Sequence, residues 1–282
     1  MKYEVIQSHR NMYPVKAMCE LLGVSESGYY AWVKREPGQR MRQDAEQKAT
    51  IISIWNSFRG IYGAPRIYKE LKARGIRISQ KRVARLMREA GIQGKMAHRK
   101  RPQTTRSDDS HTVAPNLLNR QFKVTEANKV WLTDITYIET KQGYLYTVGV
   151  LDLGSRQLVG LAMADHMRTE LVQQALNMAI VQQQPSAGLL HHSDRGRQYT
   201  SHDYQQKLKD AQFLISMSRR GSCLDNAPME SFWPTLKREC ADHIFETREQ
   251  ARTTIFGYVM AFYNRIRRHS AIDYQAPITR AA

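Results

Sequence analysis

From about residue 118 onward, the order of strand and helix patterns constrains the fold more than any other feature of the chain. Three segments rich in β-branched and aromatic residues come first, "KVWLTDITYIE", "GYLYTVGVLDL" and "RQLVGLAMAD". This composition is typical of strands, and Gly143 marks a turn between the first two. The three segments therefore predict an antiparallel meander.

The segments that follow alternate between helix and strand patterns. "TELVQQALNMAIVQQ" and "SHDYQQKLKDA" are helical, whereas "GLLHHSD" and "FLISMSR" are typical of short strands. Two further helical segments end the chain, "APMESFWPTLKREC" and "REQARTTIFGYVMAFYNRIRRH". This order predicts an α/β domain over residues 118–282, a mixed five-stranded sheet with helices on both faces, which is the ribonuclease H-like arrangement.

The chain ahead of this domain has only helical patterns. Residues 1–40 predict an N-terminal helix-turn-helix segment, and residues 43–93 predict a second, three-helix helix-turn-helix domain that binds DNA. Residues 94–117 are polar and basic and have little periodicity, so we expect a linker that follows phosphates.

The charge of the chain indicates a polyanionic partner. It has 43 lysines and arginines against 26 aspartates and glutamates, a net charge of +17 and a pI near 9.9. Solubility alone would also explain an excess of this kind, but the basic residues cluster in particular helices and linkers. We therefore expect double-stranded DNA as the partner.

The last helix of the 43–93 domain combines an apolar stripe with a cationic surface. Its stripe consists of Val83, Leu86, Met87 and Ala90. Its remaining surface carries Lys81, Arg82, Arg85 and Arg88. A merely solvated helix has the same pattern, but two helix-turn-helix patterns in one basic chain favour a recognition helix that lies in a DNA groove.

The sequence predicts neither a membrane segment nor a structure held by cysteines. No stretch approaches the roughly 20 apolar residues of a membrane span, and the N-terminus has no signal-peptide core. We therefore expect a cytoplasmic, nucleoid-associated protein with no membrane partner. The 3 cysteines are odd in number and lack metal-ligand spacing, so neither a disulfide framework nor a zinc site is predicted.

Three acidic residues stand where elements of the predicted sheet end near one another. Asp134 lies within the first strand, Asp194 closes the fourth, and Glu230 lies one turn into the helix after the fifth. In this topology the first and fourth strands are neighbours, so both aspartates can point to one edge. Converging carboxylates need a cation, and two Mg²⁺ ions about 4 Å apart support phosphoryl transfer.

The chain resembles the DDE transposases of bacterial insertion sequences. The motifs that carry the resemblance are "WLTDITYI", "HHSDRGRQYTS", the 35 residues between Asp194 and Glu230, "GSCLDNAPMESFWPTLKREC" and "YNRIRRHS". They are most similar to the downstream-frame (OrfB) product of the two-frame family named after insertion sequence three, which is related to retroviral integrases. The upstream segment "SFRGIYGAPRIYKELKARGIRISQKRVARLMREAGI" is similar to that family's helix-turn-helix segment.

The resemblance implies an activity and a set of partners. Asp134, Asp194 and Glu230 would be the catalytic, metal-binding triad, with two Mg²⁺ or Mn²⁺ ions per site. The reaction would be nicking at the 3′ ends of the element, followed by attack of the exposed 3′-hydroxyl on another phosphodiester. The chain would act as a homo-oligomer on element ends and target DNA, with the upstream-frame product of the same element as a further partner.

The expected DNA contacts near the catalytic site are Arg195, Arg197, Lys237, Arg265, Arg267 and Arg268. Of these, Lys237 is carried over from the family, in which a basic residue two helical turns after the glutamate approaches the terminal DNA. Arg197 stands where the family has a small residue, and it adds either a phosphate contact or only charge. The "YNRIRRHS" arginines would be a solvated helix end if they do not touch DNA.

Several other residues have two interpretations. Asp152 is a turn residue or lies near the site, and Trp233 is a core residue or stacks on a flipped base. One of His191 and His192 is expected in the core and the other at the rim of the site. Pro234 lacks the N–H that would bond the carbonyl of Glu230, so we expect a kink in that helix.

Two rival functions remain at this point. A catalytically silent, transposase-derived repressor would bind DNA without cutting it, and the complete acidic triad argues against this reading. A ribonuclease H-like nuclease would nick DNA but would not join it.

Overall fold

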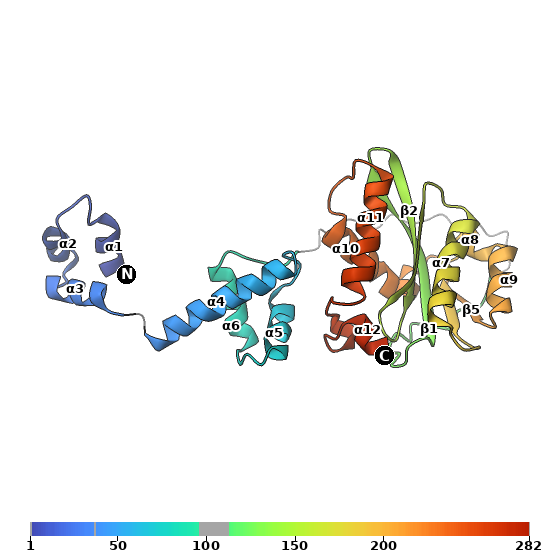
Figure 1. Cartoon of the computed structure of the whole chain (residues 1–282), viewed down its shortest axis with the longest axis horizontal. Coiled ribbons are helices and arrows are strands. Elements are labelled where there is room, and N and C mark those ends of the chain that lie inside the picture. The colour runs from blue at the N-terminus through green and yellow to red at the C-terminus, as the bar shows by residue number, and fades with distance from the viewer. Residues whose placement is uncertain (1, 37, 96–112, 282) are drawn as a thin grey trace.

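The computed structural model describes residues 2–36, 38–95 and 113–281, which form three successive parts along the long axis of the molecule (Figure 1). The expected linker, 94–117, lies for most of its length outside the described residues.

The first part consists of three short helices, α1 (Lys2–His9), α2 (Val15–Leu22) and α3 (Glu26–Lys34). Gly23 ends α2 in the left-handed conformation with a φ of 62°, and the Ser25 side chain accepts a backbone N–H in the first turn of α3. The helix-turn-helix pattern predicted for this segment is therefore present. Helix α1 was not predicted, and it packs its buried Ile6 against Cys19 and Tyr29.

The second part is a three-helix domain of α4 (Gln39–Ser57), α5 (Ala64–Ala73) and α6 (Gln80–Glu89). Helix α4 begins earlier than the expected boundary at residue 43, and its first residues lie within the segment 1–40 that was predicted as the first helix-turn-helix. The Ser79 hydroxyl caps α6 by accepting the backbone N–H of Arg82 at 3.2 Å. The apolar stripe of α6 faces inward, so Val83, Leu86 and Met87 are buried.

The third part contains one five-stranded sheet with the order β3-β2-β1-β4-β5. Its strands are β1 (Val130–Thr140), β2 (Gly143–Asp152), β3 (Leu158–Ala164), β4 (Leu190–Ser193) and β5 (Leu214–Met217). The first three are antiparallel neighbours, whereas β4 is parallel to β1 and β5 is parallel to β4. This confirms the predicted mixed sheet and its ribonuclease H-like order.

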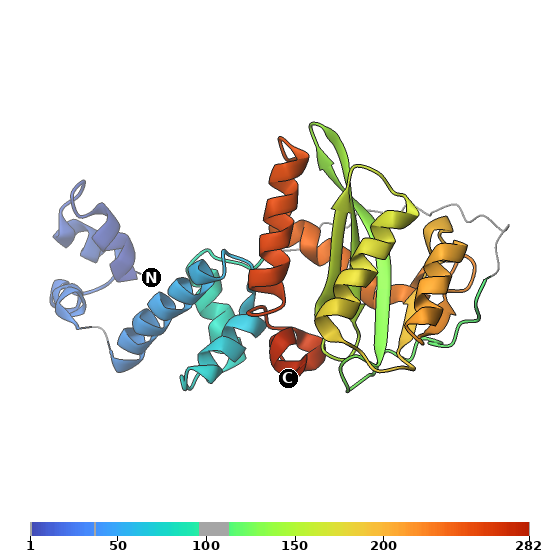
Figure 2. The same cartoon turned by 45° about the vertical axis from the view of Figure 1, so that its right-hand side comes forward.

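Helices cover both faces of the sheet, so its strands bury side chains on both sides (Figures 1 and 2). Along β1, Leu132 and Ile138 belong to the core on the side of α10 (Ala227–Cys240) and α11 (Arg248–Gly257), whereas Trp131 belongs to the core beneath α7 (Thr169–Gln183). Successive strand residues point to opposite faces, which separates the two cores. The shorter helices α8 (Arg197–Thr200) and α9 (His202–Asp210) lie on the α7 side.

The C-terminal elements begin with a 3-10 turn (Cys223–Asn226) that leads into α10. Helix α10 continues through Pro234 without a break in its assignment, and the kink expected there stays a prediction. A π-helical turn (Tyr258–Tyr263) extends α11, and a 3-10 turn (Ser270–Ile272) and α12 (Pro277–Ala281) follow. No helix in the described parts of the chain is long and apolar enough to cross a membrane.

The three-helix domain docks on the C-terminal elements of the sheet domain (Figure 2). The Tyr62 hydroxyl accepts the backbone N–H of Arg268 at 2.8 Å, and Arg66 Nε donates to the backbone carbonyl of the same residue at 3.0 Å. Arg268 in turn donates from Nε to Glu70 at 2.7 Å. Backbone and side-chain contacts thus join these two parts of the chain at Arg268.

Candidate active site

Asp134 of β1 and Asp194, which follows the end of the neighbouring strand β4, lie beside each other. Leu132 of β1 pairs with His192 of β4 in the parallel ladder, and the two aspartates each lie two residues further along. Both carboxylates also act on the buried Tyr199, because burial and then the charges of Asp134 and Asp194 raise the pKa of its hydroxyl well above the usual value. The expectation that the two acids meet at one edge is therefore confirmed.

The electrostatic state of this pair follows from its partial burial. Burial first, and then the neighbouring charge of Asp194, raises the pKa of Asp134 to about 7. Burial also raises the pKa of Asp194, while the backbone N–H of Gly196 counteracts this by donating to its Oδ1 at 2.8 Å. Two crowded carboxylates resist simultaneous ionisation. A bound cation would remove that resistance.

Glu230 lies in the first turn of α10, and its side chain is exposed. Its charge contributes to the raised pKa of Asp134, as the smallest of the causes. Among the residues that the structure describes, no three histidine, cysteine, aspartate or glutamate side chains are grouped so that they could hold a metal ion together. The structure thus brings the two aspartates together and leaves Glu230 at the rim.

The start of α10 is fixed against β1 by Asn226. Its side-chain amide donates to the backbone carbonyl of Thr133 at 3.1 Å, and both residues are buried. Thr133 precedes Asp134, so this bond sets the position of the Glu230 helix relative to the aspartate. Asn226 is the N-cap residue of α10, but its side chain makes no capping hydrogen bond.

Trp233 donates its indole N–H to Oδ2 of Asp134 at 3.0 Å. Its side chain is 5% exposed, so the core interpretation is confirmed and the base-stacking alternative is wrong. No local sequence pattern indicates this contact, because it depends on how α10 packs across β1.

His191 and His192 are both fully buried, so the placement of one of them at the rim was wrong. His192 contacts the hydroxyls of Ser216 and Ser218 at 2.8 and 3.1 Å, and His191 contacts the Tyr204 hydroxyl at 3.1 Å. Burial lowers their pKa values to about 3 and about 4 for His191 and His192, so both are neutral at physiological pH.

Asp152 is a turn residue, as the first of its two interpretations proposed. Its carboxylate accepts the backbone N–H of Asn128 at 2.8 Å and that of Ser155 at 2.8 Å. These bonds tie the loop after β2 to the segment before β1, and they engage both carboxylate oxygens.

The cations that were expected to contact DNA near the catalytic site differ in exposure. Arg195 is partly buried and donates from Nε to the carbonyl of Ser218 at 2.7 Å, while Arg197 and Arg265 are exposed. The Lys237 ammonium lies 4.8 Å from the ring centroid of Tyr137. DNA contacts by these four cations stay predictions.

Arg267 corrects the expected set of DNA contacts. It is 2% exposed and donates to both carboxylate oxygens of Glu239 at 2.7 Å each. A buried arginine with this partner cannot reach a DNA phosphate, so the predicted contact is wrong. Arg268 is partly buried, and its bond to Glu70 belongs to the docked interface between the domains.

The four cations of α6 also separate into two groups. Arg82 and Arg85 both donate to the carboxylate of Asp44 on α4, at 2.7 and 2.8 Å. These bonds brace α6 against α4. Lys81 and Arg88 are exposed, and they present charge to the solvent.

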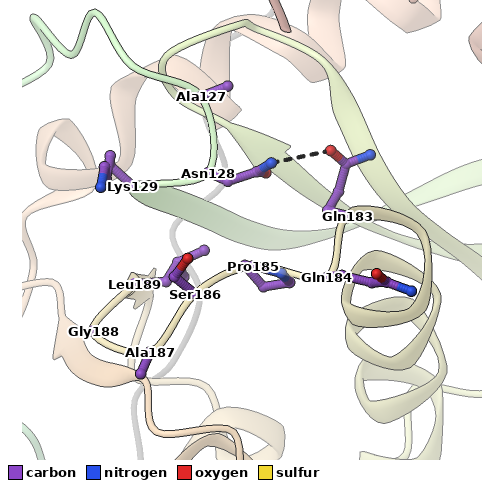
Figure 3. A pocket seen from close by; sticks show the side chains of 10 residues that line it. All are labelled: Ala127, Asn128, Lys129, Gln183, Gln184, Pro185, Ser186, Ala187, Gly188 and Leu189. Atoms are coloured by element: carbon purple, nitrogen blue, oxygen red, sulfur yellow. Dashed lines mark hydrogen bonds between the residues drawn. The ribbon is translucent and has the colours of Figure 1, made fainter. Parts of the chain in front are cut away.

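A separate pocket lies at the opposite end of the parallel strands, between residues 127–129 and 183–189 (Figure 3). Asn128 donates to Gln183 at 3.3 Å across it. These two ranges contain no aspartate or glutamate, and they adjoin the starts of β1 and β4, whereas Asp194 follows the end of β4. The pocket is therefore distinct from the aspartate pair.

The donor atoms of the aspartate site suit a hard divalent cation. Magnesium and manganese ions prefer carboxylate oxygens, and Asp134 and Asp194 present such oxygens in a partly buried place where their repulsion favours a cation. Glu230, whose charge also raises the pKa of Asp134, is the candidate for a third carboxylate ligand.

Comparisons with known proteins agree with this architecture. Residues 124–223 and 211–277 match two models described as integrase core domains, and residues 42–101 match an HTH-like domain. The chain is 44% identical to an uncharacterized 31 kDa protein of insertion element IS600 from Shigella sonnei, over 92% of this chain and 96% of that protein. It is 39% identical to transposase InsF for insertion sequence IS3A from Escherichia coli strain K12, over 96% of this chain and 94% of that protein.

Solved structures similar to the chain come from retroviruses. One is the intasome of simian T-cell lymphotropic virus in complex with PP2A regulatory subunit B56 gamma, with 13% identity, a TM-score of 0.48, and coverage of 78% of this chain and 70% of that chain. Another is the HTLV-2 integrase catalytic core domain in complex with magnesium, with 14% identity, a TM-score of 0.42, and coverage of 56% of this chain and 98% of that chain.

Proposed function

The chain belongs to the family of insertion-sequence transposases that includes transposase InsF of IS3, and from this we propose that Asp134, Asp194 and Glu230 carry its reaction. It is a DNA transposase of the DDE type, with an integrase core domain and an HTH-like domain. The proposed reaction is nicking at the 3′ ends of the element followed by strand transfer into a target.

The convergence of Asp134 and Asp194 is the observation that carries this assignment. The ladder pair Leu132–His192 fixes the two aspartates next to each other, and burial together with their mutual repulsion raises the pKa of Asp134 to about 7. A strongly shifted pKa in a partly buried site is characteristic of catalytic groups. A chain with a net charge of +17 supplies the attraction for the DNA backbone around them.

Asp134, Asp194 and Glu230 would together hold divalent ions, Mg²⁺ or Mn²⁺, two per site. These ions, when bound, help to activate the attacking oxygen and to stabilise the leaving oxygen. The exposed Glu230 side chain would turn from the rim toward the aspartates to complete the ligand set. The hydrogen bonds of Asn226 and Trp233 to β1 would hold α10 in place against that strand while the Glu230 side chain moves.

The proposed chemistry has two successive steps, a hydrolysis and then a transesterification. In the first, a water oxygen forms a bond to the phosphorus at the element end and the P–O3′ bond breaks, which leaves a 3′-hydroxyl. In the second, that hydroxyl oxygen attacks a target phosphodiester, and the target's own 3′-oxygen leaves. No bond between protein and DNA forms in either step, and the carboxylates hold the reacting groups in line.

The basic residues near the site would hold the two DNA strands. Arg195, Arg197, Lys237 and Arg265 are the proposed phosphate contacts near the aspartates. Lys81 and Arg88 of α6 are proposed to contact the recognised end sequence. The docked interface at Arg268 would keep these two regions at a fixed distance.

The proposed function also implies an assembly and a location for the protein. Joining two element ends requires at least two active sites, so we propose a homo-oligomer, with the upstream-frame product of the same element as a further partner. The protein would work in the cytoplasm on the nucleoid.

The test uses purified protein, labelled duplexes that carry the ends of its own element, and Mg²⁺. The unaltered protein is expected to nick the ends and to join them to a target duplex. Asp194→Asn is expected to abolish both steps and to retain DNA binding. Binding without any cutting by the unaltered protein would indicate a repressor, and cutting without joining of precleaved ends would indicate a nuclease.

A further inference from the structure

The hydrogen bond between Trp233 and Asp134 joins the catalytic helix to the catalytic strand. The indole Nε1 donates to Asp134 Oδ2 at 3.0 Å, and only 5% of the Trp233 side chain is exposed. An indole N–H is a donor that has no acceptor function. It can therefore orient a carboxylate without competing for the metal ions that the carboxylate would bind.

The ring of Trp233 is held in its place by the strand that pairs with Asp134. Gly149 of β2 is the direct partner of Asp134 in the antiparallel ladder. A Cβ atom at Gly149 would lie 3.0 Å from Cη2 of Trp233 and 3.2 Å from Cε of Met229. The absent side chain of Gly149 thus leaves the space that the indole fills, and the ring has little freedom to move away from Asp134.

We propose that Trp233 is a positioning residue, which holds the Asp134 carboxylate in the orientation that binds the divalent ion. This inference rests on the proposed function of Asp134. Carboxylates that bind metals are themselves held by hydrogen bonds, and loss of such a partner typically lowers metal affinity or activity by about 10- to 100-fold. The alternative is that Asp134 only provides an acceptor for the buried indole N–H, and that the ring of Trp233 only fills the core.

Trp131, which lies on the same strand as Asp134, provides a matched control. It is fully buried on the opposite face of β1, and its indole donates to Oδ1 of Asn128 at 3.2 Å. Trp131→Phe therefore makes the same chemical change as Trp233→Phe without removing a bond to Asp134.

The experiment measures Mn²⁺ binding by the complex of the full-length protein with a duplex of its own element end. Free Mn²⁺ is followed by its electron paramagnetic resonance signal, so the readout does not depend on turnover. Trp233→Phe is expected to weaken Mn²⁺ binding about 10-fold or more, while Trp131→Phe binds Mn²⁺ like the unaltered protein. Joining of precleaved ends should need correspondingly more Mg²⁺ for half-maximal rate in Trp233→Phe.

A second variant guards against a folding defect. Incorporation of 3-benzothienylalanine at position 233 replaces the N–H by sulfur and keeps the two fused rings. It is expected to weaken Mn²⁺ binding as Trp233→Phe does, with an unchanged melting temperature in EDTA.

The possible outcomes distinguish failure of the positioning role of Trp233 from failure of the proposed function. Mn²⁺ binding by the benzothienyl variant equal to that of the unaltered protein would overturn the positioning role, while loss of joining in Asp134→Asn would still support the proposed function. Full joining by Asp134→Asn, or no Mn²⁺ binding by the unaltered complex, would overturn the proposed function and this inference with it.

Discussion

Arg267 donates to both carboxylate oxygens of Glu239, at 2.7 Å each, and neither side chain is more than 2% exposed. The Tyr258 hydroxyl adds a third bond to this carboxylate at 2.7 Å. Burial acts to raise the pKa of Glu239, but the bonds and charge of Arg267 outweigh it and keep that pKa below its usual value. The "YNRIRRHS" segment is thus anchored inside the domain.

Removing Arg267 should therefore affect folding. Arg267→Ala leaves the Glu239 carboxylate buried without its cation, which typically costs about 3–5 kcal/mol of the free energy of unfolding. The exposed neighbour provides the control, because Arg265→Ala should change that free energy by less than about 0.5 kcal/mol. Urea unfolding measures both. Unchanged stability of Arg267→Ala together with weaker DNA binding would restore its role as a DNA contact.

Asp134 should make the metal-free protein less stable as the pH rises. The carboxyl group of the unfolded chain has its ordinary pKa of 3.8, whereas that of the folded protein has a pKa of about 7 and keeps its proton up to that pH. The folded state thus binds more protons between these values, and its stability falls with rising pH across this window. Asp134→Asn removes the effect, so in EDTA its melting temperature should exceed that of the unaltered protein at pH 8.

This advantage of Asp134→Asn should shrink toward zero near pH 4, where the unfolded carboxyl group is also protonated. Mg²⁺ at pH 8 should stabilise the unaltered protein and leave Asp134→Asn unchanged. An equal melting temperature for the two proteins at pH 8 in EDTA would contradict the raised pKa.

Gly149 should not tolerate even one added methyl group. Its Cβ would lie 3.0 Å from Trp233 and 3.0 Å from Cδ1 of Leu158, so Gly149→Ala forces the packed core to shift, at a typical cost of about 1–3 kcal/mol. Gly257 in α11 is the matched control, because a Cβ there meets nothing within 4 Å. Gly257→Ala should raise the free energy of unfolding by about 0.5–1 kcal/mol.

Denaturant unfolding distinguishes the two alanine variants, and joining assays add a second comparison. Gly149→Ala should also slow strand transfer, since displacement of Trp233 disturbs Asp134. Equal stability and equal joining by the two variants would show that the indole is not confined by Gly149.

The exposed cations of α6 should govern the salt dependence of DNA binding. Lys81→Ala and Arg88→Ala should each weaken binding and reduce the slope of log K against log salt by about 1, because each removes one phosphate contact. Arg82→Ala should instead loosen the contact of α6 with Asp44 on α4. The slopes are measured by fluorescence anisotropy of a labelled duplex at salt concentrations from about 50 to about 200 mM. Unaltered slopes in both exposed variants would exclude α6 from the DNA interface.

The sheet and the aspartate pair were predictable from the sequence, because their signals are local. Asp134 lies in a segment of strand-forming residues, and Asp194 ends another. Strand order then requires the two to meet, since β1 and β4 are neighbours in this topology. Chain order and residue type were sufficient for this part of the site.

The roles of individual cations were not predictable in the same way. Arg265 and Arg267 belong to one basic motif, yet one is exposed and the other is buried against Glu239, 28 residues away in sequence. A pattern of charges does not reveal which cation has a buried acidic partner. The contact of Trp233 with Asp134 likewise depends on how α10 packs across β1, which no local pattern specifies.

On DNA, Asp134, Asp194 and Glu230 are proposed to gather around divalent ions. The most direct measurement is a crystal structure of the protein with an element-end duplex and Mn²⁺, with anomalous scattering recorded at the manganese edge. We predict anomalous peaks between Asp134 and Asp194, with the Glu230 carboxylate turned inward to share them. An ordered DNA end with no manganese at these carboxylates, or manganese bound at another set of side chains, would contradict the account.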